Sequence, residues 1–184
     1  MKTFIALLRG INVGGHKKIK MAELRKMFEA LDCKEVETYI QSGNVVFKIA
    51  NGNVPSLEKI IKKGILDYFG IDVPVLVKTK IELKKIVEDN PYEEGEGAGS
   101  TYFVLLHTPP EKSMVDSLRQ LSFENETFVI TPLCVYLNCK KGYGNAKCNN
   151  NFFETKLKVS ATTRNFKTME RLMVLAETRS DFTN

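Results

Sequence analysis

The chain has 184 residues, of which 43% are hydrophobic and 27% are charged, as is usual for a globular protein. No stretch approaches the roughly 18 consecutive apolar residues of a membrane-spanning helix, so we expect no membrane partner. The four cysteines include no Cys-x-x-Cys pair, and there are only two histidines. We therefore expect buried thiols, with neither a disulfide framework nor a metal site.

Charge is unevenly distributed along the chain. Residues 1–87 carry a net charge of +7, residues 88–126 carry −7 and residues 127–184 carry +5. Basic stretches attract phosphate groups or nucleic acid, but a solvated surface would show the same excess of lysine and arginine. Charge alone leaves both interpretations open.

The first part of the chain predicts alternating strands and helices. A buried strand is expected at Thr3–Arg9, because its residues are apolar on both faces. Apolar residues then recur at helical spacing, and Ser42-Gly43 predicts a tight turn between two strands. The remaining expected elements are a helix over residues 21–31, strands at Val36–Gln41 and Asn44–Ile49, a helix over 57–69 and a strand at Val73–Lys78.

The rest of the chain predicts a second set of similar elements. They are helix Lys80–Asp89, strand Thr101–His107, helix 114–121, strands Thr127–Thr131 and Cys134–Asn138, helix 152–157, strand Lys158–Ala161 and helix 169–176. Thr79 and Glu82 have the spacing of a capping box at the start of the first of these helices. The acidic glycine-rich segment 93–99 predicts a flexible loop that proteases cut first.

Both halves therefore read approximately as β-α-β-β-α-β, the ferredoxin-like motif. Two strands, Phe4–Leu8 and 102–106, are apolar on both faces, so both faces of each sheet need cover. We predict an α/β (α+β) fold of two duplicated ferredoxin-like halves packed into one pseudo-symmetric body. The expected boundaries are 1–79, with the basic glycine loop, and 80–184, with the acidic loop and the C-terminal helix.

The loop between the first strand and the first helix is the most distinctive candidate site. It combines glycines, which allow close approach of a ligand to the backbone, with lysines and an arginine, and it contains no acid. A glycine-rich turn before a helix can bind an anion, although the spacing fits neither a P-loop nor a dinucleotide fingerprint. An ordinary connection with solvated lysines is the alternative. The expected ligand-binding residues here are Arg9, Gly10, Asn12, Gly14, Gly15 and Lys17.

A second polar cluster precedes the last helix. It comprises Thr162, Thr163, Arg164 and Asn165. Asn165 is a plausible helix N-cap, but capping does not explain the other three polar residues. An arginine beside hydroxyl groups can hold an oxyanion. We predict that these residues and the glycine loop share one anion-binding pocket.

Three segments carry a resemblance to one bacterial family. They are ALLRGINVGG at residues 6–15, YIQSGNVVF at 39–47 and TTRN at 162–165. Together they resemble the signature of domain-of-unknown-function family 1697, over essentially the whole chain. The resemblance implies a compact α/β protein with a duplicated ferredoxin-like arrangement, and it implies no activity. Family members often carry Arg-Ser-Lys where this chain has Asn145-Ala146-Lys147, and Trp at the position of Phe166. If that arginine touches a ligand in relatives, the contact is lost or moved here.

The favoured function is binding of a phosphorylated small molecule or nucleic acid in the cytoplasm. The apolar run after Met1 is too short for a signal peptide, which favours that compartment. Two alternatives remain: an enzyme acting on a phosphorylated small molecule, for which His16 is the obvious acid or base in the loop, and an oligomeric or partner-binding module. No nucleophile elbow, metal-binding helix or paired carboxylates identify catalytic residues, and no cofactor or protein partner is indicated.

Overall fold

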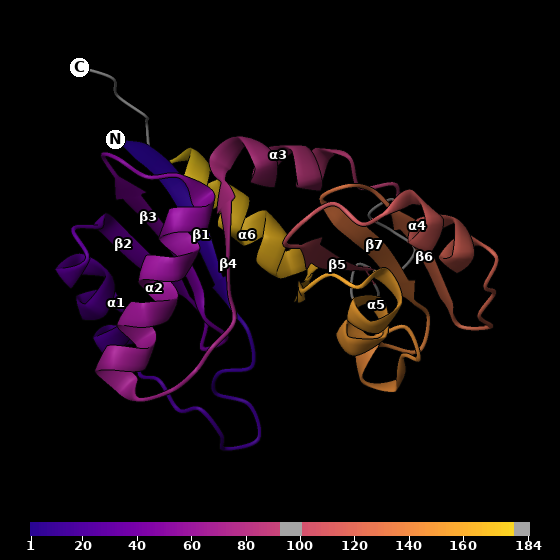
Figure 1. Cartoon of the computed structure of the whole chain (residues 1–184), viewed down its shortest axis with the longest axis horizontal. Helices are drawn as coiled ribbons and strands as arrows, with labels where there is room; N and C mark the ends of the chain where they lie inside the picture. The colour runs from indigo at the N-terminus through magenta and orange to yellow at the C-terminus, as the bar shows by residue number, and fades with distance from the viewer. Residues whose placement is uncertain (93–100, 179–184) are drawn as a thin grey trace. The chain divides into compact units, whose positions relative to one another are not determined.

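The computed structural model describes residues 1–92 and 101–178 (Figure 1). The predicted flexible loop at 93–99 lies outside the described residues. Contacts divide the chain into two units. Met1–Lys85 forms the first unit together with the chain from Arg171 onward, and Ile86–Glu170 forms the second. The boundary expected between residues 79 and 80 stays a prediction.

The first unit contains one antiparallel sheet in the order β2-β3-β1-β4. Helices α1 and α2 connect its strands and share a core with one face of the sheet, where Phe28 and Phe47 meet edge to face. The elements are β1 (Lys2–Leu8), α1 (Met21–Ala30), β2 (Lys34–Tyr39), β3 (Asn44–Ile49), α2 (Val54–Phe69), β4 (Val75–Thr79) and α3 (Lys80–Glu88), which continues into the second unit.

The second unit repeats the same strand order as β6-β7-β5-β8. Helices α4 and α5 cover the face that carries Val104 and Leu137. The elements are β5 (Thr101–Leu106), α4 (Lys112–Arg119), β6 (Glu126–Ile130), β7 (Cys134–Cys139), the short 3₁₀ helix η1 (Tyr143–Asn145), α5 (Asn150–Leu157), β8 (Ala161–Asn165) and α6 (Phe166–Glu177), which ends in the first unit.

The two sheets confirm the predicted α/β fold of duplicated ferredoxin-like halves. In each, the first strand lies between the third and fourth, and every neighbouring pair is antiparallel. The last strand of each half also runs straight into a helix, α3 or α6. The packing of the halves into one pseudo-symmetric body stays a prediction.

The unbroken apolar run of β1 is buried on both of its faces, as predicted. Phe4, Ala6 and Leu8 belong to the core beneath α1 and α2. Ile5 and Leu7 point to the opposite face and are 0% exposed. Continuous apolar sequence in a strand is thus explained by cover on both sides of the sheet.

Side-chain caps begin the helices that follow the last strand of each half. The Thr79 backbone N–H donates to the Glu82 carboxylate at 2.8 Å, and the Glu82 N–H donates to the Thr79 hydroxyl at 3.1 Å. This confirms the predicted capping box. The Asn165 side chain accepts from the Thr168 N–H at 2.9 Å, which confirms its predicted role as N-cap of α6.

The last strand differs from the sequence-based expectation. A strand was expected at Lys158–Ala161, followed by the polar cluster 162–165 just before the last helix. Instead β8 occupies Ala161–Asn165, and Lys158 ends α5 in the left-handed conformation with φ of 57°. Threonine is well suited to a strand, and pairing with the apolar strand β5 outweighs the short apolar signal before it.

The four cysteines are free and buried, as expected for thiols that take part in packing. Burial raises the pKa of the Cys33 and Cys139 thiols to about 11 and that of Cys148 to about 12. These thiols are therefore protonated and unreactive at neutral pH. Every helix within residues 1–92 and 101–178 is too short or too polar to cross a lipid bilayer.

Candidate functional site

The loop between β1 and α1 folds back on itself as a small hairpin. Gly14 and Gly15 have φ angles of +59° and +78°, the pair of left-handed conformations found in a type I′ turn. The His16 N–H donates to the Val13 carbonyl at 3.0 Å, and the Asn12 N–H donates to Lys17 at 3.2 Å. The N–H groups of Gly14 and Gly15 have no acceptor among the described residues. The turn therefore presents two adjacent donors to solvent.

This hairpin is separate from the helix that follows it. Helix α1 begins at Met21, its N-cap Lys20 makes no side-chain capping bond, and the Gly14–Gly15 turn lies several residues earlier. The expectation that the glycines lie at a helix N-terminus is therefore wrong. Any attraction of the turn for anions comes from its own N–H groups and from nearby lysines, because a helix dipole acts only within the first turn.

Asn12 holds the loop in place through its side chain. Its Oδ1 accepts from the Ile19 N–H at 2.8 Å, and its Nδ2 donates to the Ile19 carbonyl at 2.9 Å and to the Gln41 carbonyl at 2.8 Å. Its φ of 54° is a conformation that asparagine tolerates better than most residues. These bonds use both amide hydrogens, so Asn12 orders the loop by contacts within the protein.

The Asn12 bond to Gln41 joins two of the sequence motifs in space. The Leu8 N–H also donates to the Gly43 carbonyl at 2.8 Å. A Cβ atom at Gly43 would lie 2.6 Å from Leu8 Cβ and 2.9 Å from Ile11 Cδ1. The hairpin turn around Gly43 therefore packs directly against the start of the basic loop, at one end of the first sheet.

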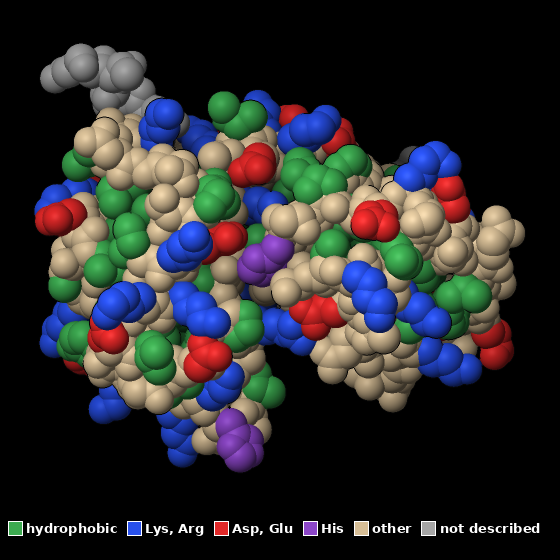
Figure 2. Space-filling view, viewed as in Figure 1, with side chains coloured by type: hydrophobic (Ala, Val, Ile, Leu, Met, Phe, Trp, Pro, Cys, Tyr) green, Lys and Arg blue, Asp and Glu red, His purple; other side chains and the backbone are tan. Residues whose placement is uncertain are grey.

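Cationic side chains surround the glycine turn. Lys17, Lys18 and Lys20 are exposed, and Arg9 is half-buried. Lys17 Nζ donates to the Asp72 carbonyl at 2.7 Å, whereas Lys18 makes no hydrogen bond or ion pair within the described part of the chain. Lysine and arginine side chains (blue) are visible around the tip of the loop at the lower end of the first unit (Figure 2). The loop therefore combines backbone donors with positive charge.

The second predicted cluster lies on strand β8, where most of its polar groups bond within the protein. The Thr163 hydroxyl donates to Asn150 Oδ1 at 2.8 Å and accepts from the Tyr143 hydroxyl at 3.2 Å. An Arg164 guanidinium nitrogen donates to the Thr163 carbonyl at 2.9 Å, and Asn165 caps α6. Thr162 is 0% exposed, and its hydroxyl has no partner among the described residues.

Arg164 remains charged although its guanidinium is buried. Burial lowers the pKa of its guanidinium to about 10, well above neutral pH. Its main-chain neighbour on β5 is Phe103, so its side chain shares that residue's face of the sheet. Thr163 lies on the opposite face, with Val104. The strand therefore directs these two predicted ligand residues to opposite faces.

Sequence reasoning missed the residues that Thr163 contacts. The Tyr143 ring lies 4.7 Å from that of Tyr102, and its hydroxyl accepts from the Asn150 N–H at 2.8 Å. Only the aromatic character of Tyr102 and Tyr143 could have signalled this network, and both resemble ordinary core residues in the sequence. The basic loop belongs to the first unit and the Thr162–Asn165 cluster to the second. Their meeting in one pocket stays a prediction.

We expect replacement of Asn12 by alanine to destabilise the first unit by about 2–3 kcal/mol, because three hydrogen bonds are lost at about 1 kcal/mol each. Urea denaturation followed by circular dichroism measures the change. Asn12→Asp should lose at least as much as the alanine variant, since its carboxylate can still accept from the Ile19 N–H but would face the Ile19 and Gln41 carbonyl oxygens to which the amide donates. A loss below about 0.5 kcal/mol for the alanine variant would contradict the role given to this side chain.

The fold and the loop together define a duplicated ferredoxin-like α/β protein that carries a basic, glycine-containing hairpin at one end of its first sheet. A family model described as "Protein of unknown function (DUF1697)" matches residues 1–136. The chain therefore belongs to this family, as its sequence motifs predicted.

A solved structure has the same fold. The conserved bacterial protein SP0830 from Streptococcus pneumoniae superposes with a TM-score of 0.71 at 21% sequence identity. The match covers 95% of this chain and 98% of that protein, so the shared fold extends over nearly the whole length of both. No curated protein matches the chain in sequence.

Proposed function

We propose that this protein binds a phosphorylated or otherwise anionic ligand at the loop from Arg9 to Lys20. The observation that carries the proposal is the exposed Gly14–Gly15 turn, which has two unbonded N–H groups and is followed in the same loop by three exposed lysines. Successive backbone N–H groups in a left-handed turn form a small anion-binding concavity. Lysines next to such a turn add charge attraction, which is strongest for phosphate groups.

The hydrogen bonds that hold the loop in one conformation also support this proposal. Binding costs less when the donors already have their bound arrangement. Asn12 bonds to Ile19 and Gln41, and Lys17 reaches the Asp72 carbonyl, so both ends of the hairpin are tied to the body of the first unit. A connection that only joined a strand to a helix would need neither the left-handed glycine pair nor these ties.

The second predicted cluster, at residues 162–165, remains part of the proposal. Arg164 would supply the bidentate guanidinium and Thr162 a hydroxyl, while Thr163 and Asn165 would support the strand and the helix that carry them. We also propose a cytoplasmic location, which four free and buried cysteines support, since reducing compartments keep thiols unpaired.

The test compares two triple variants of equal charge. Lys17, Lys18 and Lys20 are changed to glutamine in the loop variant, and the exposed Lys2, Lys34 and Lys59 are changed to glutamine in the control. Fluorescence anisotropy measures binding of labelled 20-nucleotide RNA and DNA, and calorimetry measures binding of inorganic tripolyphosphate.

The loop variant should lose about tenfold or more in affinity, whereas the control should lose much less. For a nucleic acid, each lost phosphate contact should also reduce the slope of log affinity against log salt by about 0.7–0.9. Equal losses in the loop and control variants would show that only net charge matters and would overturn the loop as the site. Binding of tripolyphosphate without nucleic acid would identify a small phosphorylated ligand.

A further inference from the structure

Strand β6 forms one edge of the second sheet, and no strand among the described residues pairs with its outer side. The Thr131 N–H donates to Cys134, and the Lys140 N–H donates to Asn125, both at 2.9 Å. The antiparallel register therefore turns the backbone of alternate residues toward β7. The N–H and C=O groups of Glu126, Phe128 and Ile130 face away from the sheet, and their N–H groups have no partner among the described residues.

Each of the other three edge strands carries at least one feature that hinders pairing with another strand. In β2 the register shifts between Lys34 and Glu37, and charged residues make up half of the strand. An outward N–H of β4, at Val77, donates to the Glu58 carboxylate at 2.9 Å. The outward N–H of Ala161 in β8 donates to Glu154 at 2.8 Å. Bulges, charges and covering side chains are the usual means of blocking an edge strand.

A groove runs along the unprotected edge. One cleft of about 340 Å³ lies between β6 and the segment that follows α4, and it includes Phe123 and Phe128, whose rings are 6.2 Å apart. A second cleft of about 190 Å³ lies between α4 and the end of β6 and includes Val115. Both clefts are lined by Arg119 and Ile130, so they adjoin. The groove therefore offers apolar side chains beside free main-chain groups.

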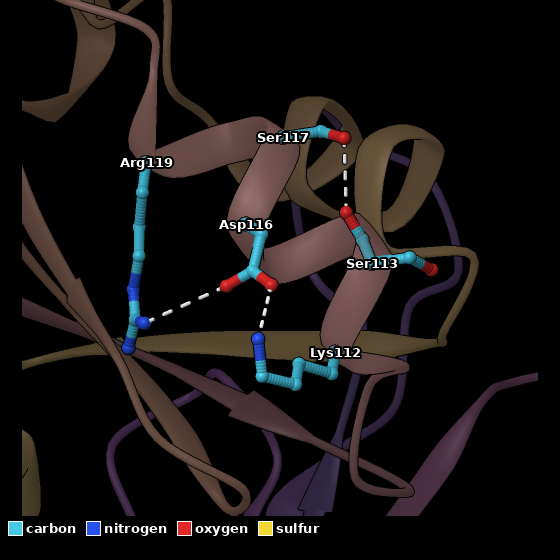
Figure 3. Close-up of polar contacts among 5 residues, drawn as sticks. All are labelled: Lys112, Ser113, Asp116, Ser117 and Arg119. Carbon is cyan, nitrogen blue, oxygen red and sulfur yellow. Dashed lines mark hydrogen bonds and ion pairs between the residues drawn. The ribbon is translucent and has the colours of Figure 1, made fainter.

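The charged residues at the junction of the two clefts favour an acidic partner. Asp116 lies between two cations on α4: Lys112 bonds to one of its oxygens, and the Arg119 guanidinium lies 3.8 Å from the other (Figure 3). The three side chains together carry one net positive charge, and the carboxylate of Glu126, the other charged residue of the two clefts, accepts from the Lys147 N–H at 2.9 Å. Arg119 is only loosely paired and can turn toward a carboxylate that lies in the groove.

We propose that β6 binds an extended peptide segment of a partner protein, which adds to the sheet as a fifth strand. The peptide carries apolar residues at alternating positions, toward Phe123, Phe128 and Ile130, and a carboxylate beside Arg119. Its backbone bonds to Glu126, Phe128 and Ile130. Strand addition of this type draws affinity from main-chain hydrogen bonds and specificity from alternate side chains.

A phage-displayed library of random 12-residue peptides tests the proposal on the full chain. Enriched peptides should alternate apolar and polar residues and contain an acidic residue. Hydrogen exchange followed by NMR should then show new protection of the N–H groups of Glu126, Phe128 and Ile130 on adding a synthetic enriched peptide. Thr127 and Val129 provide internal controls, because their N–H groups already face β7.

Two variants of equal charge change complete the test. Arg119→Glu should weaken binding of the enriched peptide by about tenfold, and Lys156→Glu, an exposed site on α5, should leave it unchanged. No enriched peptide, or binding that leaves the three N–H groups unprotected, would overturn the proposal. Equal binding by both variants would overturn the carboxylate contact. A dimer through β6 in sedimentation experiments would show a second copy as the occupant instead.

Discussion

Replacement of Gly43 by alanine should destabilise the protein by about 2–5 kcal/mol. Two costs combine at this residue. Its φ of +75° is left-handed, which costs an L-residue about 1–2 kcal/mol. The added methyl group would also lie 2.6 Å from Leu8 Cβ, and forcing an extra carbon into a packed core costs about 1–3 kcal/mol.

Gly70 provides the matched control for the backbone term. Its φ is +68°, and a Cβ there would meet nothing within 4 Å. Gly70→Ala should therefore cost only about 1–2 kcal/mol, and the excess in Gly43→Ala measures the contact with Leu8 and Ile11. Urea denaturation of both variants gives the comparison. Equal losses would mean that the two motifs do not pack tightly against each other.

The sequence predicted the elements that local pattern determines. Alternation, apolar runs and helical spacing placed the α-helices and strands of both halves to within a few residues, with the exception of β8. The capping pair Thr79–Glu82 and the cap at Asn165 could be predicted because each depends on residues three positions apart in the sequence. The burial of both faces of β1 followed from the absence of any polar residue between Phe4 and Leu8.

Contacts between segments that lie far apart in the sequence could not be predicted from local patterns. Ser42-Gly43 was interpreted as a hairpin turn, and it is one, but nothing local shows that Gly43 must also admit Leu8 and Ile11. The Asn12 bond to Gln41 links residues 29 positions apart. A single sequence gives no register between such segments, so the loop could be recognised as unusual while its geometry remained unpredictable.

Strand β8 shows a second limit of prediction from the sequence. Its residues from Thr162 to Asn165 are all polar, and they were expected as a polar cluster just before the last helix, after a strand at Lys158–Ala161. Register places Arg164 opposite Phe103, as Lys78 of β4 lies opposite Ile5. Each half thus ends in a strand whose long cation precedes a capping residue and a helix. This repeat is visible in the pairing of the strands and is hidden in the sequence, because the surrounding residues differ.

The last prediction concerns the apolar face of β1 that neither α1 nor α2 shares. Leu7 is 0% exposed and pairs in register with Asn44 and Leu76. Leu7→Ala should reduce the free energy of unfolding by about 2–5 kcal/mol, through lost apolar burial and the cavity that remains. Leu66→Ala on α2 is the control, because Leu66 is 48% exposed and should lose less than about 1 kcal/mol. Leu7 alternates with the core residues Ala6 and Leu8, so it reports on the opposite face of the sheet. A loss as small as that of the control would show that this face is accessible to water. The unbroken apolar run of β1 would then not reflect cover on both sides of the sheet.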